Sequence, residues 1–185
     1  MLIGAALVLG ALSLFLSNER ESSEAGAFSQ EVMPSIQNEI LQALETAPTE
    51  LDGSENTPVE LLRPEDLIMT EKMINGYPYI GYLTIPDLEL ELPVMSNWDS
   101  KRLRISPCRF MGTVKGEDIV IMAHNYKSHF GMLSTLTEGA AVTFVDMDGV
   151  VWNYEVVALD VLEAEAVEEM TAGEYDLTLF TCTTG

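Results

Sequence analysis

Two segments of the chain end in side chains that could act together as a nucleophile and its base. Residues 178–182 form an apolar run that ends in Cys182, after which small hydroxyl residues and a glycine follow. Residues 118–125 repeat this arrangement, because a hydrophobic run ends in His124 and a polar turn follows. A free thiol has a pKa of about 8.5, so little thiolate forms at neutral pH without a basic or cationic neighbour. We interpret Cys182 as a candidate nucleophile and His124 as its partner.

Each of these residues also has an ordinary structural explanation. A buried cysteine is usually inert packing, and a lone histidine at a strand end is usually a surface or core residue. We expect Cys108 to be a packed thiol, with a disulfide to Cys182 as the alternative in an exported protein. His129, five residues after His124, is expected at the surface of a loop rather than as a metal ligand. The His-before-Cys order also fits a caspase-like protease, but the local signatures of cysteine proteases are absent from the sequence.

The elements that must position these residues are short strands. Alternating and β-branched patterns bounded by turn residues predict strands at 79–85, 88–95, 119–124, 142–146, 150–162 and 176–182. Asp148-Gly149 between two valine-rich runs predicts a hairpin, and Pro86-Asp87 predicts a second turn. One short helix with an acidic, solvated face is expected at 163–170. This pattern predicts a β-barrel or sandwich of roughly 110 residues.

The N-terminal part differs in composition from the rest of the chain. Residues 1–17 carry no charge, so we expect a transmembrane signal-anchor, with a cleaved signal near Ala25-Gly26-Ala27 as the alternative. Residues 18–75 hold 13 acidic and 3 basic residues and are predicted to be a stalk. Within this stalk we expect one short amphipathic helix at 34–45 and a linker at 46–60. The domain is expected at 76–185.

The overall composition excludes several classes of protein. The chain has 185 residues and a formal net charge of -21, which argues against nucleic acid as a partner. Its hydrophobic content of 47% is enough for a folded core, which excludes disorder over the whole length. Two cysteines are too few for a disulfide-built scaffold or a structural zinc site. No motif indicates an organic cofactor, a metal site or a calcium-binding loop.

Four segments carry a resemblance to a known family. Residues 178–182 read T-L-F-T-C, which matches the T-L-x-T-C signature of sortases, the cysteine transpeptidases of Gram-positive bacteria. Ala123-His124-Asn125 resembles their histidine-containing strand end. Residues 80–86 and 92–94 resemble the first two strands of the family. The resemblance covers about residues 79–185, and its subclass is not assigned, although the N-terminal stretch is weakly similar to class B enzymes.

The resemblance implies a closed eight-stranded β-barrel with its active site in a groove at one end. Cys182 would attack the carbonyl of a sorting-signal peptide and form a thioester, and His124 would act as general acid and then general base. An amine of a peptidoglycan precursor or a pilin would resolve the thioester. The resemblance further implies a single-pass membrane protein, held in lipid by its N-terminal anchor, with its catalytic domain on the extracellular face.

The sequence departs from the family at its end. Sortases place an arginine on the strand after the cysteine, and this sequence stops three residues past Cys182. The three arginines at 102, 104 and 109 come too early in the chain to match it. We therefore expect an incomplete chain that lacks the last strand and has little or no activity, since loss of an oxyanion donor typically costs about 10² to 10³ in rate. The alternative is a non-catalytic extracellular β-domain that acts as a surface binding or scaffold module.

Overall fold

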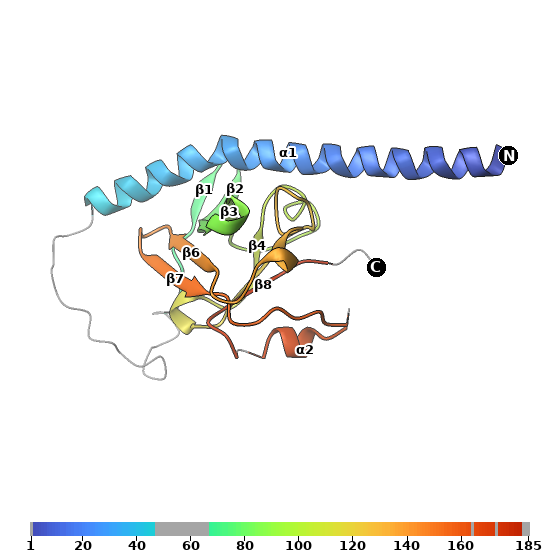
Figure 1. Cartoon of the computed structure of the whole chain (residues 1–185). Helices are drawn as coiled ribbons and strands as arrows, with labels where there is room; N and C mark the ends of the chain where they lie inside the picture. The colour runs from blue at the N-terminus through green and yellow to red at the C-terminus, as the bar shows by residue number, and fades with distance from the viewer. Residues whose placement is uncertain (1, 47–66, 164, 173, 183–185) are drawn as a thin grey trace.

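The computed structural model describes residues 2–46, 67–163, 165–172 and 174–182. A long helix, α1 (Leu2–Thr46), lies along one side of a rolled sheet and extends past it at its N-terminal end (Figure 1). The linker expected at 46–60 falls almost entirely outside the described residues. Within the described part of the chain, no helix combines the length and the apolar character needed to cross a bilayer.

The domain is built on one eight-stranded sheet. Its strands are β1 (Lys72–Ile74), β2 (Tyr77–Ile85), β3 (Leu90–Met95), β4 (Cys108–Met111), β5 (Ile119–Met122), β6 (Ala141–Asp146), β7 (Val151–Glu155) and β8 (Leu177–Phe180). The strands are ordered β7-β6-β2-β3-β4-β5-β8, and β1 pairs with β2. The β3–β4 and β5–β8 pairs are parallel, and the others are antiparallel.

The expected mainly-β, barrel-like class is confirmed, and the sheet of the described residues is nearly but not fully closed. Strands β7 and β8 lie at the two ends of the strand order, and they do not pair with each other within the described residues. Short helical segments make the turns: η2 (Pro86–Leu88), η3 (Val114–Gly116), η4 (Leu133–Thr135) and α2 (Val167–Met170).

The two predicted turns are present. The amide of Gly149 donates to the carbonyl of Asp146 (3.0 Å), and Gly149 has a φ of 83°, so the β6–β7 hairpin turns at Asp148-Gly149. The Asp146 carboxylate accepts the amides of Asp148 and Val150, both at 3.0 Å, which fixes the turn. Pro86 begins η2, and Glu89 after it has a φ of 54°, which joins β2 to β3. Both hairpins follow from local turn chemistry.

Two strands were not expected from the sequence, and one was overestimated. Strands β1 and β4 are only three and four residues long, too short to show a period of two. Strand β7 ends at Glu155, whereas a strand to residue 162 was expected. Residues 156–163 have no regular structure, and most of their side chains are exposed. The apolar run there lacks the covering surface that a strand needs.

The domain has two hydrophobic clusters, one on each face of the sheet. The inner cluster fills the rolled sheet with residues from β2, β3, β5 and β6, together with Phe130. The outer cluster lies between the sheet and α1, and its buried members are Val32, Ile36, Ile40, Ile74, Tyr79, Met95, Cys108, Val145 and Met147. Strand β2 contributes to both clusters by alternation, and the bulge between Tyr79 and Gly81 shifts the phase so that Leu83 and Ile85 join Ile80 in the inner cluster.

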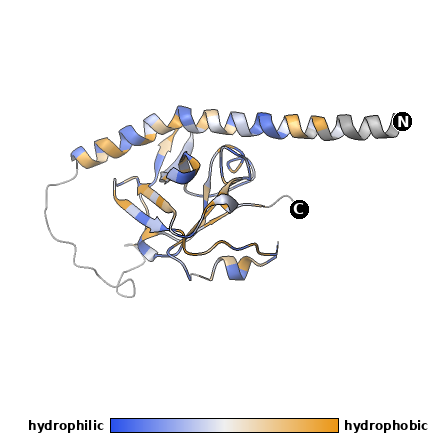
Figure 2. Cartoon of the chain, viewed as in Figure 1, coloured by the Kyte–Doolittle hydropathy of each residue, from blue (hydrophilic) through white to orange (hydrophobic). Residues whose placement is uncertain are grey.

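Helix α1 is far longer than the short segment expected at 34–45. It passes through Pro34, although proline in a helix interior removes one backbone hydrogen bond. Residues on both sides of Pro34, among them Val32 and Ile36, are fully buried against the sheet. Tertiary packing of an apolar stripe therefore maintains the helix where sequence propensity would end it. Figure 2 shows polar and apolar residues interspersed along the coloured part of the helix.

Candidate active site

Strand β5 brings His124 to one end of the sheet. Ile119, Val120 and Ile121 are buried, so the strand is held on both faces before it reaches the polar turn. The amide of Ala123 still donates to the carbonyl of Phe180 on β8 (3.2 Å), and His124 follows at once. The carbonyl of His124 accepts the amide of Phe130 (3.1 Å), which folds the loop back on itself. His124 is half-buried at this position.

Strand β8 brings Cys182 to the same end. The two strands run parallel, with Ile119 opposite Leu177 and Met122 opposite Phe180. His124 and Cys182 each lie two residues past the last of these pairs, so they occupy equivalent positions on neighbouring strands. Neighbouring strands are about 4.8 Å apart. The structure thus places the two predicted site residues at the same end of two neighbouring strands, and Cys182 is exposed with a free thiol.

The second cysteine has a different environment. Cys108, on β4, is fully buried, and its thiol donates to the carbonyl of Ser106 (3.4 Å). Burial raises the pKa of Cys108 to about 12, so this thiol stays protonated. Both cysteines are free, so the disulfide considered from the sequence is not formed, and the packed thiol expected at Cys108 is confirmed.

The electrostatic surroundings of His124 favour its neutral form. Burial lowers the pKa of His124, the nearby Arg104 guanidinium lowers it further, and the Glu21 carboxylate raises it. Arg104 precedes β4, whereas Glu21 belongs to α1. A neutral imidazole can accept a proton, which is what a neighbouring thiol needs to become a thiolate.

Tyr126 is a part of this site that sequence reasoning missed. Its ring stacks on His124 with centroids 4.8 Å apart and an interplanar angle of 24°. Its hydroxyl donates to Oε2 of Glu21 (2.7 Å). Burial and then the hydrogen bond to Glu21 raise the pKa of Tyr126 to about 12. The only sequence signal was an aromatic residue two positions after the histidine, because Glu21 lies 105 residues away along the chain.

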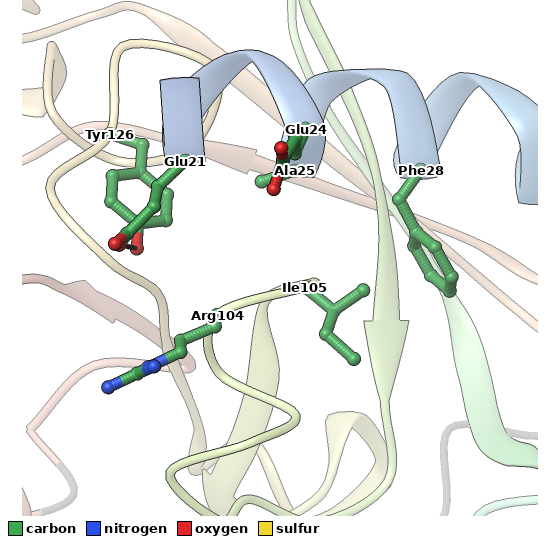
Figure 3. A pocket seen from close by; sticks show the side chains of 7 residues that line it. All are labelled: Glu21, Glu24, Ala25, Phe28, Arg104, Ile105 and Tyr126. Atoms are coloured by element: carbon green, nitrogen blue, oxygen red, sulfur yellow. Dashed lines mark hydrogen bonds between the residues drawn. The ribbon is translucent and has the colours of Figure 1, made fainter. Parts of the chain in front are cut away.

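A cavity of about 430 Å³ lies between α1 and the domain, beside Tyr126 and Glu21 (Figure 3). The α1 side chains of Glu21, Glu24, Ala25 and Phe28 line one wall. Arg104 and Ile105 line the opposite wall, and Tyr126 stands at the end where it meets Glu21. The cavity separates the helix from the loop that precedes β4, so α1 contacts the His124 loop mainly around Tyr126 and Ser128.

The expectation for His129 was wrong. The sequence placed it at the surface, but its side chain is fully buried, and its ring lies 5.6 Å from that of Tyr126. Neither ring nitrogen has a hydrogen-bond partner within the described residues. Burial and, to a smaller extent, His124 lower the pKa of His129 to about 4, against a small opposing effect of the Ile105 backbone. The loop turns inward because Phe130, the next residue, belongs to the inner cluster.

Comparison with known proteins gives the site its context. The family model of the sortase domain matches residues 83–185, more than half of the chain. The chain is 26% identical over 141 residues to sortase A of Streptococcus agalactiae, covering 68% of this chain and 55% of that protein. The chain thus spans about half the length of this relative.

Solved structures agree with the observed fold. Sortase C1 from Streptococcus suis is 27% identical, with a TM-score of 0.51 over 60% of this chain and 68% of that chain. Sortase A from Corynebacterium diphtheriae has a TM-score of 0.53 at 20% identity, covering 93% of this chain and 88% of that chain. The nearly closed sheet and the family model over residues 83–185 lead to one conclusion: the chain belongs to the sortase family.

Proposed function

We propose that this protein is a cysteine transpeptidase in which Cys182 is the nucleophile and His124 is its acid–base partner. Members of the sortase family are cysteine transpeptidases, which supports the reaction class. The observation that carries the assignment is the parallel pairing of β5 and β8, because both strands finish at the same end of the sheet. Exposure of Cys182 and burial of Cys108 point to the first thiol rather than the second.

In the proposed reaction His124 acts first as a base. The neutral imidazole takes the proton of the Cys182 thiol, and the thiolate attacks the scissile carbonyl of the peptide. The imidazolium then gives its proton to the departing amine, which leaves a thioester on Cys182. An incoming amine loses a proton to His124 and attacks this thioester, and the thiol is regenerated. The lowered pKa of His124 supports its starting role as a base.

The proposed substrates are a C-terminal sorting signal and an amine acceptor. The acceptor would be a peptidoglycan precursor or a lysine of a pilin. One solved relative, sortase C of Streptococcus pneumoniae, is described with pilin substrate specificity; its TM-score is 0.54 at 20% identity, over 89% of this chain and 81% of that chain. That description belongs to the relative, and it supports a pilin as one candidate substrate here.

We further propose that the N-terminal apolar run holds the protein at the cell membrane with its domain on the outer face. The helix carries exposed Leu12, Phe15 and Leu16 beyond the part that packs on the sheet. Fractionation of cells that express the full chain, followed by protease treatment of intact cells, tests this placement. Recovery of the chain in the soluble fraction would contradict it.

Intact mass spectrometry of the full chain after incubation with a panel of sorting-signal peptides tests the chemistry. Since the sequence predicts little activity for this chain, we expect an acyl adduct that accumulates slowly on the wild type and on Cys108→Ala, and none on Cys182→Ala. Cys108→Ala is the matched control, because it removes the buried thiol and leaves the exposed one. An adduct that survives in Cys182→Ala would assign the chemistry to another residue. No adduct on any peptide, with Cys182 shown to be free, would favour a non-catalytic binding domain.

A further inference from the structure

The orientation of His124 depends on an aromatic neighbour. A histidine just past the end of a strand is not held by the sheet ladder, so its ring needs another constraint to face the neighbouring strand. The ring of Tyr126 provides a flat surface at 4.8 Å, nearly parallel to the imidazole. Stacking of this kind restricts rotation of the imidazole about its side-chain bonds and favours one ring plane.

Tyr126 is itself fixed at both of its ends. Its backbone carbonyl accepts the amides of His129 and Gly131, each at 2.9 Å. Its hydroxyl donates to the Glu21 carboxylate at 2.7 Å, a charge-assisted hydrogen bond. Tyr126 is 4% exposed, whereas Glu21 is exposed, so the bond is shielded from water on the tyrosine side only. A ring held in this way can hold the ring next to it.

A second set of contacts on α1 holds the Glu21 carboxylate in position. The Ser128 hydroxyl donates to the carbonyl of Ser22 (2.6 Å), and the two serine hydroxyls are 3.2 Å apart. A Cβ at Gly26 would lie 3.1 Å from the Cβ of Ser128, so the helix and the loop approach closely. These contacts fix the helix next to the loop without touching the ring of Tyr126.

We propose that Tyr126, anchored by Glu21 of α1, is a positioning residue that holds the His124 ring in the orientation needed for proton exchange with Cys182. The proposal deepens the function proposed above and rests on it for the role of His124. It makes the N-terminal helix a component of the active site, in addition to its packing on the sheet.

The test uses the full chain with isotope-labelled histidine rings. The sequence has two histidines, so His124→Asn assigns both signals. Tyr126→Phe removes the hydrogen bond and keeps the ring, and Glu21→Ala removes the acceptor. Glu21→Gln keeps an acceptor and removes the charge. Ser22→Ala is the matched control, because it removes the Ser22 hydroxyl that contacts the hydroxyl and the amide of Ser128, away from Tyr126.

We expect Tyr126→Phe and Glu21→Ala to move the His124 ring shifts toward those of a solvated imidazole. Glu21→Gln should keep the ring shifts and lower the titration midpoint of His124, since the Glu21 charge favours its protonated form. Acylation of Cys182 by a sorting-signal peptide should slow by ~10-fold in Tyr126→Phe, because small errors in the placement of catalytic groups have large effects on rate. Ser22→Ala should leave the His124 ring shifts unchanged and should slow acylation by less than about twofold.

Two results would overturn the proposal: unchanged His124 shifts in Tyr126→Phe, or equal changes in Ser22→Ala and Tyr126→Phe. The second result would mean that the hydrogen bond only docks the helix. The ring shifts do not depend on turnover. Absence of any acyl adduct on the wild type would therefore refute the proposed function, while the shifts would still decide whether Tyr126 positions His124.

Discussion

The buried stripe on α1 has two halves that lie on the same face of the helix but have different roles. Toward the C-terminus the stripe consists of Val32, Ile36 and Ile40, which are 0–6% exposed and belong to the outer cluster. Toward the N-terminus the same face carries Ser22, Ala25 and Ser29, which are 3–8% exposed. The large apolar half buries hydrophobic area, which is the main source of folding stability.

The small half provides close approach in place of hydrophobic area. Serine and alanine allow the helix to come within hydrogen-bond distance of the loop at Ser128, and the adjacent cavity shows that apolar packing is incomplete there. Hydrogen bonds are directional, so they define the relative position of two elements, although each contributes little net stability. The comparison teaches that one half of the helix contributes stability and the other half contributes position.

The largest effect should come from breaking the apolar half. Ile36→Ala removes a fully buried side chain, so we expect the free energy of unfolding to fall by about 2 to 5 kcal/mol. Chemical denaturation of the full chain measures this loss. Leu41→Ala is the control on the same helix, since Leu41 is 59% exposed and should cost less than about 0.5 kcal/mol. Equal losses in the two variants would mean that the helix does not pack as described.

The next effect comes from acid and acts on His129, in the loop that the small half of the helix contacts. An unfolded histidine binds a proton below pH 6.5, whereas buried His129 resists protonation down to about pH 4. Stability from this group is complete above pH 6.5 and is lost as the pH falls to about 4, by as much as about 3 kcal/mol.

Unfolding free energies measured between pH 8 and pH 4 check the acid effect. His129→Leu should lose the part of the pH dependence that belongs to this residue. Titration of other groups persists in both proteins, so the difference between them isolates His129. Identical pH profiles in the two proteins would show that His129 is accessible to protons in the folded state.

Breaking the polar half directly should have a smaller effect on stability. Ser22→Ala removes the hydroxyl that contacts Ser128, and we expect a loss of about 1 kcal/mol in the free energy of unfolding. Hydrogen exchange in residues 124–131 should increase, because the loop loses one of its contacts with the helix. A loss as large as that of Ile36→Ala would contradict the division of roles between the two halves.

The smallest effect is expected at the exposed edge of the helix. Arg20 pairs with Glu24 at 2.7 Å, but both side chains are largely exposed. Exposed ion pairs of this kind contribute little, because water and salt screen them. Arg20→Ala should therefore leave the denaturation midpoint unchanged within error. A clear shift would show that Glu24 has a role at the cavity that its pairing with Arg20 supports.

Local patterns predicted the strand ends but not what surrounds them. The Asp148-Gly149 hairpin and the apolar runs before His124 and Cys182 are encoded within a few residues, so the sequence was sufficient to predict them. The same holds for the resemblance to the family, which short motifs were enough to predict. Pairing of β5 with β8 then placed the two motifs side by side, which strand patterns alone do not specify.

Contacts between distant segments were not predictable in this way. The Glu21–Tyr126 hydrogen bond joins residues 105 positions apart, and no local pattern marks either partner. His129 was misplaced because its polar neighbours, Lys127 and Ser128, resemble a surface loop, whereas Phe130 draws the loop inward. The extent of α1 was missed because Pro34 suggested a helix start, and only burial of the flanking residues overrides it.

The length of α1 gives this division of roles a mechanical consequence. The apolar half fixes the helix near Ile36, and Glu21 lies 15 residues toward the N-terminus. At 1.5 Å per residue the two points are about 22 Å apart, so a tilt of about 5° at Ile36 would displace Glu21 by about 2 Å. This displacement is enough to break a hydrogen bond of 2.7 Å. A small tilt of α1 about the outer cluster would therefore be amplified along the helix and would separate Glu21 from Tyr126.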